Sequence, residues 1–321
     1  MLEIKLSDRN TQTRWEKNAT VRSRPRRLLE QFQTDTGFYY PTSRQPLAIH
    51  PAIEKLGEEA KRYILLQSLY KYSSDIAYIE TQVVNRITLY IAHDGLEITF
   101  DPEWRRDALT IVIDESYHAY VALDSLIQIQ NHTQIKPLDL GNTVSLELAI
   151  DWFKKELGEE SHKIMELICV CIAENTLTKE IAAMMDRKET HRYFQHILRD
   201  HLTDEARHSS FFLAVLKHLW ENLDETRRYE IGTRLPQFIT QYLDNSLQRA
   251  FDVTILRALG LAEECLEVII EDTYTNPEFS ATHPMIKNIM SLLHNAGVLK
   301  HGPTKSAFSK YNWIELGILN Q

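Results

Sequence analysis

The chain has 321 residues, of which 43% are hydrophobic, and its 45 acidic and 36 basic residues give a net charge of −9. This hydrophobic content is enough for a large core and excludes an intrinsically disordered chain. The negative charge argues against nucleic acid or an anionic membrane as a partner. Glycine and proline occur only 10 times each, below their average usage, which favours long helices with few tight turns.

Cysteine content and hydropathy bear on the cellular compartment. The three cysteines, Cys169, Cys171 and Cys265, do not suffice for a disulfide framework. No stretch approaches the roughly 18 uncharged apolar residues of a membrane helix, and the N-terminus lacks an apolar signal region. We therefore expect a soluble, cytoplasmic protein with no membrane partner.

Residues 1–48 are polar and basic and contain Pro25, Pro41 and Pro46. They predict an N-terminal arm with a short helix, wrapped on the rest of the protein. The basic run at residues 22–27 (RSRPRR) could in principle contact a nucleic acid. In an acidic chain, a solvated or salt-bridged arm is the favoured interpretation, and we expect no nucleic-acid partner.

Helical periodicity begins after the arm. Apolar residues recur at helical spacing from Ile64 to Val83 and place Glu80 inside an apolar face. Asp101, followed by proline, is typical of a helix start. The helix that follows carries Glu115, and the next predicted helix carries Glu174. Further helices are predicted at residues 189–221, 224–246, 248–272 and 283–296.

A long connection at residues 131–144 separates these helices into two halves. Two helices in each half, joined by a long crossover, are the plan of a ferritin-like bundle. We therefore predict an all-α, ferritin-like helical bundle with additional helices and an N-terminal arm. The predicted single domain spans residues 1–321: the arm (1–48), the metal-binding helices (51–220), and the additional helices and tail (224–321).

Two copies of the motif Glu-x-x-His, at Glu115 to His118 and at Glu205 to His208, mark the candidate site. The first and fourth residues of the motif lie on one face of a helix. Two such motifs, each accompanied by a lone Glu on another helix, are typical of a dinuclear carboxylate centre in a helical bundle. The alternative is two solvated helical faces with incidental histidines. Both copies begin with Asp-Glu and each has a Glu upstream in an apolar helix, which argues against chance.

His201 adds a further candidate ligand, because it lies on the same helical face as Glu205 and His208, four and seven residues before them. A lone core or surface histidine is the alternative. Carboxylate oxygen and imidazole nitrogen suit iron or manganese better than metals that prefer thiolate. The complete set of predicted metal ligands is Glu80, Glu115, His118, Glu174, His201, Glu205 and His208.

Two aspartates precede the motifs and are the candidate partners of the ligating histidines. We predict that Asp204 accepts the ring N–H of His118 and that Asp114 accepts that of His208. The alternative is a surface charge on each helix. Four glutamates and three histidines carry a charge near −4, which two ferrous ions would nearly neutralise, so the metals should add to stability.

The order Glu…Glu-x-x-His…Glu…His-x-x-x-Glu-x-x-His resembles the di-iron N-oxygenases that make nitroaromatic natural products, and the resemblance runs from about Trp15 through His208. The third histidine, here His201, distinguishes that family from other ferritin-like enzymes. The resemblance implies two iron ions that cycle between Fe2+ and Fe3+ with an oxo or peroxo bridge, and O2 as co-substrate. It also implies oxidation of a primary arylamine, a small-molecule substrate, through hydroxylamine and nitroso to nitro.

Alternative functions keep the metals but change the reaction. The target could be carbon, as in hydroxylation, desaturation or oxidative cleavage. An iron-storage or structural bundle is a further alternative, but the length of the chain and His201 argue against it. The chain lacks a Gly-rich dinucleotide motif and a Cys-rich iron–sulfur motif, so electrons must come from an external protein or small reductant. A homodimer is left open.

The substrate-binding residues stay unknown from sequence. Thr178 lies one turn after Glu174, where it is either a catalytic threonine or bonds back to the preceding turn, as helical threonines commonly do. Tyr72, Ser73 and Ser74 precede Glu80 by about two turns and would leave space beside the metals. A core polar patch explains them equally well. No clear Arg or Lys is available for a substrate carboxylate.

Overall fold

The computed structural model describes residues 11–185, 188–274 and 280–314, and every regular element in that part of the chain is a helix. This confirms the predicted all-α fold class. Between the described helices, one isolated parallel bridge joins Phe38 to Thr190. The arm and first half contain α1 (Thr11–Asn18), α2 (Thr20–Ser23), α3 (Pro51–Glu54), α4 (Glu58–Tyr78), the π-helix η5 (Ile79–Asn85), α5 (Arg86–Ala92) and α6 (Pro102–Thr133).

The second half begins at the long connection. It contains α7 (Ser145–Lys155), α8 (His162–Met184), α9 (Arg192–Asn222), α10 (Glu225–Tyr242), α11 (Ser246–Ala258), α12 (Glu263–Thr273), α13 (Pro284–Asn295) and α14 (Gly302–Ser309). Short 3-10 helices are η2 (Leu29–Phe32), η3 (Thr42–Arg44), η4 (Pro46–Ile49), η6 (Glu159–Ser161) and η7 (Val298–Lys300). Within the described residues, no helix is both long enough and apolar enough to cross a bilayer.

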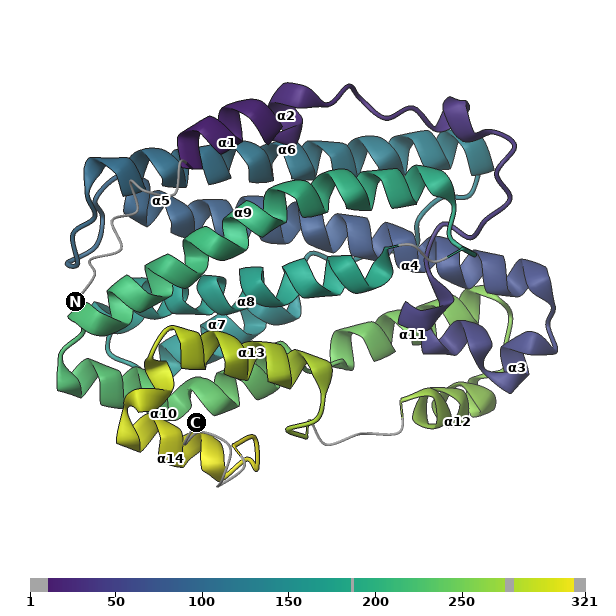
Figure 1. Ribbon diagram of the computed structural model, residues 1–321. Coiled ribbons are helices and arrows are strands. Elements are labelled where there is room, and N and C mark those ends of the chain that lie inside the picture. The colour runs from purple at the N-terminus through teal and green to yellow at the C-terminus, as the bar shows by residue number, and fades with distance from the viewer. Residues whose placement is uncertain (1–10, 186–187, 275–279, 315–321) are drawn as a thin grey trace.

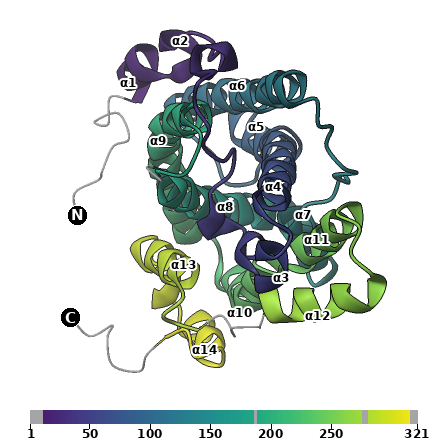
Figure 2. The ribbon, with the colours of Figure 1, turned by 90° about the vertical axis from the view of Figure 1, so that its right-hand side faces the viewer.

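The continuous column α4–η5–α5, together with α6, α8 and α9, forms the centre of the bundle (Figure 1). α8 packs along α9, and the α4–η5–α5 column packs along α6. Figure 2 shows these helices around a common interior, with α1 and α2 on one side and α10 to α14 on the opposite side. The arm helices contact both α6 and α9. This is the ferritin-like arrangement predicted from the two halves and their crossover.

Two helix predictions need correction. The connection before residue 145 is followed at once by α7, which the sequence analysis did not anticipate, although Leu146, Ala149, Ile150 and Phe153 are buried at helical spacing. The single helix predicted at residues 248–272 is two helices, α11 and α12. Gly260 separates them with a φ of +78°, a left-handed conformation that ends helices and that glycine adopts without steric penalty.

Two apolar clusters of the core lie on either side of a charged region in the bundle, and a third packs α4 against α11 and α12. One cluster contains Val83, Ile111 and Phe212, and the other contains Tyr70 and Leu126. On each central helix, the candidate ligands fall between residues of the first cluster and residues of the second. The fold therefore places the candidate ligands midway along the bundle, with apolar packing at both ends.

A buried carboxylate outside this region also affects stability. Asp252 on α11 is fully buried and accepts hydrogen bonds from Gln45, Gln248 and Tyr274. Burial raises the pKa of its carboxyl to about 6, although these three donors oppose the effect. Because the folded state binds the proton of Asp252 more tightly than the unfolded state does, protonation of this carboxyl stabilises the fold. This contribution to the free energy of unfolding is complete below pH 4 and is lost as the pH rises through 6.

We therefore expect Asp252→Asn, which keeps the shape and most of the hydrogen bonds, to be more stable than the unmodified chain at pH 7–8. The difference should be about 2–3 kcal/mol, since one pKa unit corresponds to about 1.4 kcal/mol, and it should disappear near pH 4. Urea unfolding between pH 4 and 8 measures it. Asp272→Asn, at an exposed position of α12, is the control, and equal pH profiles for the two variants would contradict the expectation.

Candidate metal centre

The seven predicted ligands come together in the middle of the bundle. They form two groups whose ligand atoms lie within 4.8 Å of one another. One group contains Glu80, Glu115, His118 and His201, and the other contains Glu115, Glu174, Glu205 and His208. Because Glu115 belongs to both groups, the arrangement has the form of two adjacent sites that share one carboxylate. His201 is the most accessible of the seven, with 12% of its side chain exposed.

The helix that carries Glu80 is locally wound as a π-helix. α4 gives way to η5 at Ile79, and regular α-helix resumes at Arg86. A π-helical turn holds an extra residue and rotates the side chains that follow, and such turns are frequent at functional sites. The sequence analysis expected an uninterrupted α-helix here, because the apolar spacing alone contains no signal for this turn.

The imidazole rings of the two motifs have the same orientation. Nδ1 of His118 lies 2.9 Å from Glu115 Oε2, and Nδ1 of His208 lies 2.8 Å from Glu115 Oε1. The opposite nitrogens, Nε2, contact Asp204 at 3.1 Å and Asp114 at 3.2 Å, respectively. These are the two crossed pairings stated in the sequence analysis. An aspartate on Nε2 fixes the orientation of each ring and leaves Nδ1 directed at the shared carboxylate.

Several buried atoms of the cluster have no hydrogen-bond partner among the described residues. They are one carboxylate oxygen each of Glu80, Glu115 and Glu174, and Nδ1 of His208, whose 2.8 Å contact with Glu115 Oε1 lacks the geometry of a hydrogen bond. Buried polar atoms are normally paired, because an unpaired one loses its interaction with water without compensation. A metal cation binds where several lone pairs converge on one point and are not used in hydrogen bonds. The donor set therefore fits two divalent metal ions.

The pKa values of two of the four carboxyls point the same way, whereas neighbouring histidines hold the pKa values of Glu115 and Glu205 below their usual range. Burial raises the pKa of the Glu80 carboxyl to about 7, despite the opposing effect of His201. Burial and repulsion from Glu115 and Glu205 raise the pKa of Glu174 well above its usual range. Four carboxylates at this depth cannot all be ionised unless positive charge is added. Two divalent cations would supply that charge in place of protons.

Arg207, inside the second Glu-x-x-His motif, supplies positive charge to both aspartates. Its guanidinium contacts Asp204 at 3.2 Å and forms a short ion pair with Asp114. Only 6% of the Arg207 residue is exposed, and both carboxylates are fully buried. The sequence analysis missed this residue, although its position next to His208 was the available signal. It joins the two motif helices, α6 and α9, behind the histidines.

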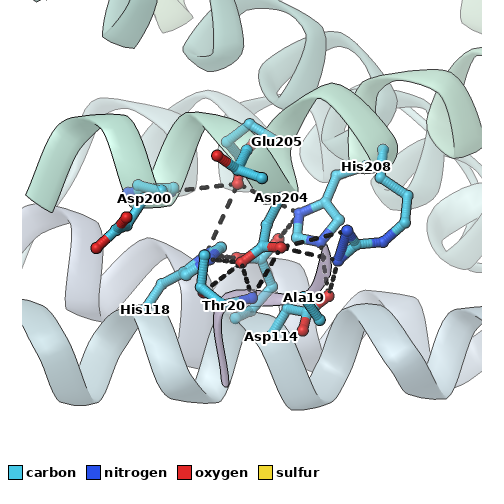
Figure 3. Close-up of polar contacts among 12 residues, drawn as sticks. Ala19, Thr20, Asp114, His118, Asp200, Asp204, Glu205 and His208 are labelled. Carbon is cyan, nitrogen blue, oxygen red and sulfur yellow. Dashed lines mark hydrogen bonds and ion pairs between the residues drawn. The ribbon is translucent and has the colours of Figure 1, made fainter. Parts of the chain in front are cut away.

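The N-terminal arm completes this network. The backbone N–H of Thr20 donates to Asp204 at 3.2 Å, and its hydroxyl donates to the same oxygen at 2.5 Å. The indole N–H of Trp15 donates to Asp114 at 2.9 Å. Figure 3 shows Thr20 next to His118 and Asp204, between the two motif helices. Neither arm residue was predicted to act near the site, although both lie in the segment that carried the family resemblance.

Thr178 bonds back along its own helix. Its hydroxyl donates to the Glu174 carbonyl at 2.7 Å and lies 3.5 Å from a Glu205 carboxylate oxygen. The first contact is the back-bonding alternative of the sequence analysis. The second is at the limit of a hydrogen bond. A catalytic role for Thr178 stays a prediction.

A pocket opens beside one of the two groups and ends on His118 and His201. Its wall is mainly aromatic and aliphatic, and includes Tyr72, Ile76, Tyr120, Val121, Tyr193, Phe194 and Leu198. The hydroxyl oxygen of Tyr72 is buried and has no hydrogen-bond partner among the described residues. Ser73 also lines the pocket, whereas Ser74 does not. Of the three residues that the sequence placed beside the metals, two therefore face this space.

The basic run of the arm also lines the pocket, through residues 24–27. Arg26 binds Asp124 through two hydrogen bonds of 2.9 and 2.6 Å, and Arg27 binds Asp200 through two of 2.6 and 2.9 Å. Arg24 lies 3.7 Å from the same Asp200. These contacts agree with the predicted salt-bridged arm. The arm therefore lines the pocket and also donates hydrogen bonds to Asp114 and Asp204.

Replacing Arg207 should destabilise the protein, because it leaves Asp114 and Asp204 buried without their cation. We expect Arg207→Met to lower the free energy of unfolding by about 3 kcal/mol or more, the usual effect of breaking a buried ion pair. Urea unfolding of the metal-free protein measures it. The control is Arg257→Met, whose exposed ion pair with Glu263 should contribute little. Equal effects of the two variants would show that Arg207 is not a required counterion.

The chain is similar in sequence to known proteins. The family model of the p-aminobenzoate N-oxygenase AurF matches residues 26–297, most of the chain. A 4-aminobenzoate N-oxygenase of Streptomyces thioluteus is 21% identical over 213 residues, which cover 65% of this chain and 62% of that relative. The family match starts later than Trp15 and extends well beyond His208, so it includes α10 to α13. The chain therefore belongs to the p-aminobenzoate N-oxygenase AurF family.

Proposed function

We propose that this chain is a di-iron N-oxygenase that uses O2 to convert a primary arylamine to its hydroxylamine, nitroso or nitro form. The observation that carries the proposal is the aromatic pocket that ends on His118 and His201, at the edge of the ligand cluster. Membership of the N-oxygenase family supports the reaction type. The small aromatic substrate and the iron are both part of the proposal.

The proposed iron ligands are Glu80, Glu115, His118, Glu174, His201, Glu205 and His208. When bound, the two iron ions would supply the activation of O2. The protein would hold them in a dry interior, and Glu115 belongs to both groups of ligand atoms. Asp204 and Asp114 keep His118 and His208 in the tautomer that presents Nδ1.

The pocket would hold the substrate ring next to these ligands. Tyr72 and Phe194 meet edge to face, with ring centroids 6.1 Å apart, and offer an aromatic wall of the kind that packs against another ring. The unpaired hydroxyl of Tyr72 is available to hydrogen-bond a polar group of the substrate. The apolar lining would also exclude water, which strengthens electrostatic interactions with the reacting nitrogen.

The charged side chains that line the pocket bear on the choice of substrate. Arg26 and Arg27 already bind Asp124 and Asp200, so positive and negative charge there largely cancel. A carboxylate on the substrate would have to compete with these aspartates. The lining therefore suits an uncharged arylamine as well as an aminobenzoate.

The proposed reaction requires electrons from outside the chain. The first two oxygenations each replace an N–H bond by N–OH, and the third adds an oxygen atom to the nitroso nitrogen. Each of the three consumes one O2, two electrons and two protons, and releases one oxygen atom of the O2 as water. The sequence contains no motif for a nicotinamide, flavin or iron–sulfur cofactor. We propose that an external protein or small reductant supplies the electrons.

Product analysis tests the reaction. We expect reduced, iron-loaded protein and 18O2 to give labelled hydroxylamine or nitro products from a panel of primary arylamines, including 4-aminobenzoate and the uncharged 4-aminobenzamide. The metal-free protein is the control. Label found only on carbon, measured by mass spectrometry, would establish a C-hydroxylase instead. Iron oxidation without any organic product would favour a storage role.

His201→Ala tests the third histidine. Because this side chain lies at the edge of the cluster, we expect the variant to fold and to retain close to two iron ions per chain. Its turnover should fall about 10–100-fold, the range seen when groups that tune a metal site are removed. Elemental analysis and stopped-flow spectra after O2 addition measure the two effects. His196→Ala, on the same helix outside the ligand set, is the control. Unchanged spectra and turnover in His201→Ala would show that His201 is not a ligand.

A further inference from the structure

A second cavity lies between the N-terminal arm and α9, and basic residues line it. Its volume is about 410 Å³, and none of the side chains that line it is acidic. They are Arg14, Lys17, Asn18, Ser23, Arg24, Thr203 and Arg207. This basic cavity is distinct from the aromatic pocket, since the two have only Arg24 in common.

The chain itself neutralises little of the positive charge in the basic cavity. Arg14 and Lys17 are exposed, and neither forms an ion pair or a side-chain hydrogen bond with a described residue. Arg24 is 48% exposed and lies 3.7 Å from Asp200. Residues 11–27 contain six basic residues and one acidic residue, in a chain whose net charge is −9. The arm is therefore a positive region on an acidic protein.

Arg207 connects the basic cavity to the metal centre. This residue is only 6% exposed, and its Nε has no hydrogen-bond partner among the described residues. Its guanidinium forms the short ion pair with Asp114, which contacts Nε2 of His208 at 3.2 Å. Trp15 of α1 donates to the same aspartate at 2.9 Å. Two unbroken series of polar contacts therefore lead from the arm to a proposed iron ligand.

We propose that the basic cavity is the docking site of an acidic electron-donor protein. The inference rests on the proposed function, which requires electrons from outside the chain, and it assigns the place where they enter. Each donor molecule loses one electron and one ferric ion gains it. Two such transfers return both ions to the ferrous state, and no atom is transferred.

The exposure of the basic side chains favours a protein partner over a small anion. Apart from Arg207, every residue that lines the basic cavity is exposed. Water and salt screen a small anion from exposed charges. An acidic protein surface can contact several of these cations at once, and the acidic remainder of the chain repels it, which directs it to the arm. α1 and α2 lie on the outside of the bundle, against α6 and α9 (Figure 2).

Binding of a plant-type [2Fe–2S] ferredoxin, an acidic one-electron donor, tests the docking site. We expect the oxidised ferredoxin to bind the iron-loaded, full-length protein at low ionic strength, and the affinity to fall steeply with salt. The double variant Arg14→Glu/Lys17→Glu should raise the dissociation constant about 10-fold or more, because it replaces attraction by repulsion. Calorimetry measures the constants, and circular dichroism confirms that the variant folds.

The matched control makes the same change in net charge elsewhere. Lys287→Glu/Lys300→Glu alters exposed positions of α13 and η7, and Figure 2 shows α13 on the side of the bundle opposite the arm. Because salt screens charges over such distances, this control should change the dissociation constant by less than about two-fold.

Stopped-flow reduction of the ferric protein, without O2 or amine, tests electron transfer. Reduction by ferredoxin should slow about 10-fold or more in Arg14→Glu/Lys17→Glu, whereas reduction by the small cation of reduced methyl viologen should not slow. Equal binding and equal reduction rates in the two double variants would overturn the inference. So would tight binding of pyrophosphate in the basic cavity while ferredoxin responds to neither variant.

The viologen reaction separates this inference from the proposed function. If viologen reduces the iron but the arm variant does not affect ferredoxin, the docking site is wrong and the proposed N-oxygenase is untouched. Iron that accepts no electrons even from viologen would contradict the proposed function, and this inference with it.

Discussion

The rest of the structure depends on burying several carboxylates in the middle of an apolar bundle. Glu80, Glu115, Glu174 and Glu205 come from different helical columns and meet where water is excluded. Ionised carboxylates in such surroundings repel one another strongly and lose their hydration. Imidazole rings next to the carboxylates offset part of this repulsion. The remaining carboxylate lone pairs converge on two positions, each of which could hold a metal ion. Apolar clusters on both sides keep the helices together despite the charge between them.

A second layer of charge makes this arrangement possible. Asp114 and Asp204 orient the histidines, but they add two more buried negative charges. Arg207 lies between them, and the arm supplies N–H and O–H donors from Trp15 and Thr20. Neutralisation by one guanidinium and several hydrogen bonds is what allows two carboxylates to be fully buried. The arm is therefore part of the site, since it closes the network that holds the rings.

α6 combines two roles on two of its sides. Its inner side carries Glu115 and His118, and one flank binds the arm through Asp114, Asp124 and Gln128. The periodicity of this one helix therefore serves both the ligand geometry and the contacts that hold the arm on the site.

Much of the site could be predicted from sequence, because its ligands follow the geometry of the helix. Glu-x-x-His places Glu115 and His118 on one face in any α-helix, and the low content of Gly and Pro already favoured long helices. The crossover and the all-α bundle followed from the same periodicity. The break at Gly260 and the short α7 were missed, because a single glycine, or one helix of 11 residues after a long connection, is a weak local signal.

The contacts between segments far apart in the chain were decided only by the tertiary structure. Trp15 and Asp114 are separated by 99 residues, and Thr20 and Asp204 by 184, and no spacing rule relates such pairs. The π-helical turn at Glu80, the place of Arg207 and the wall of the pocket also depend on how the helices pack. The sequence by itself determined which residues share a helical face, since that depends on the 3.6-residue repeat alone. Which of these faces meet one another was determined by the packing of the whole chain.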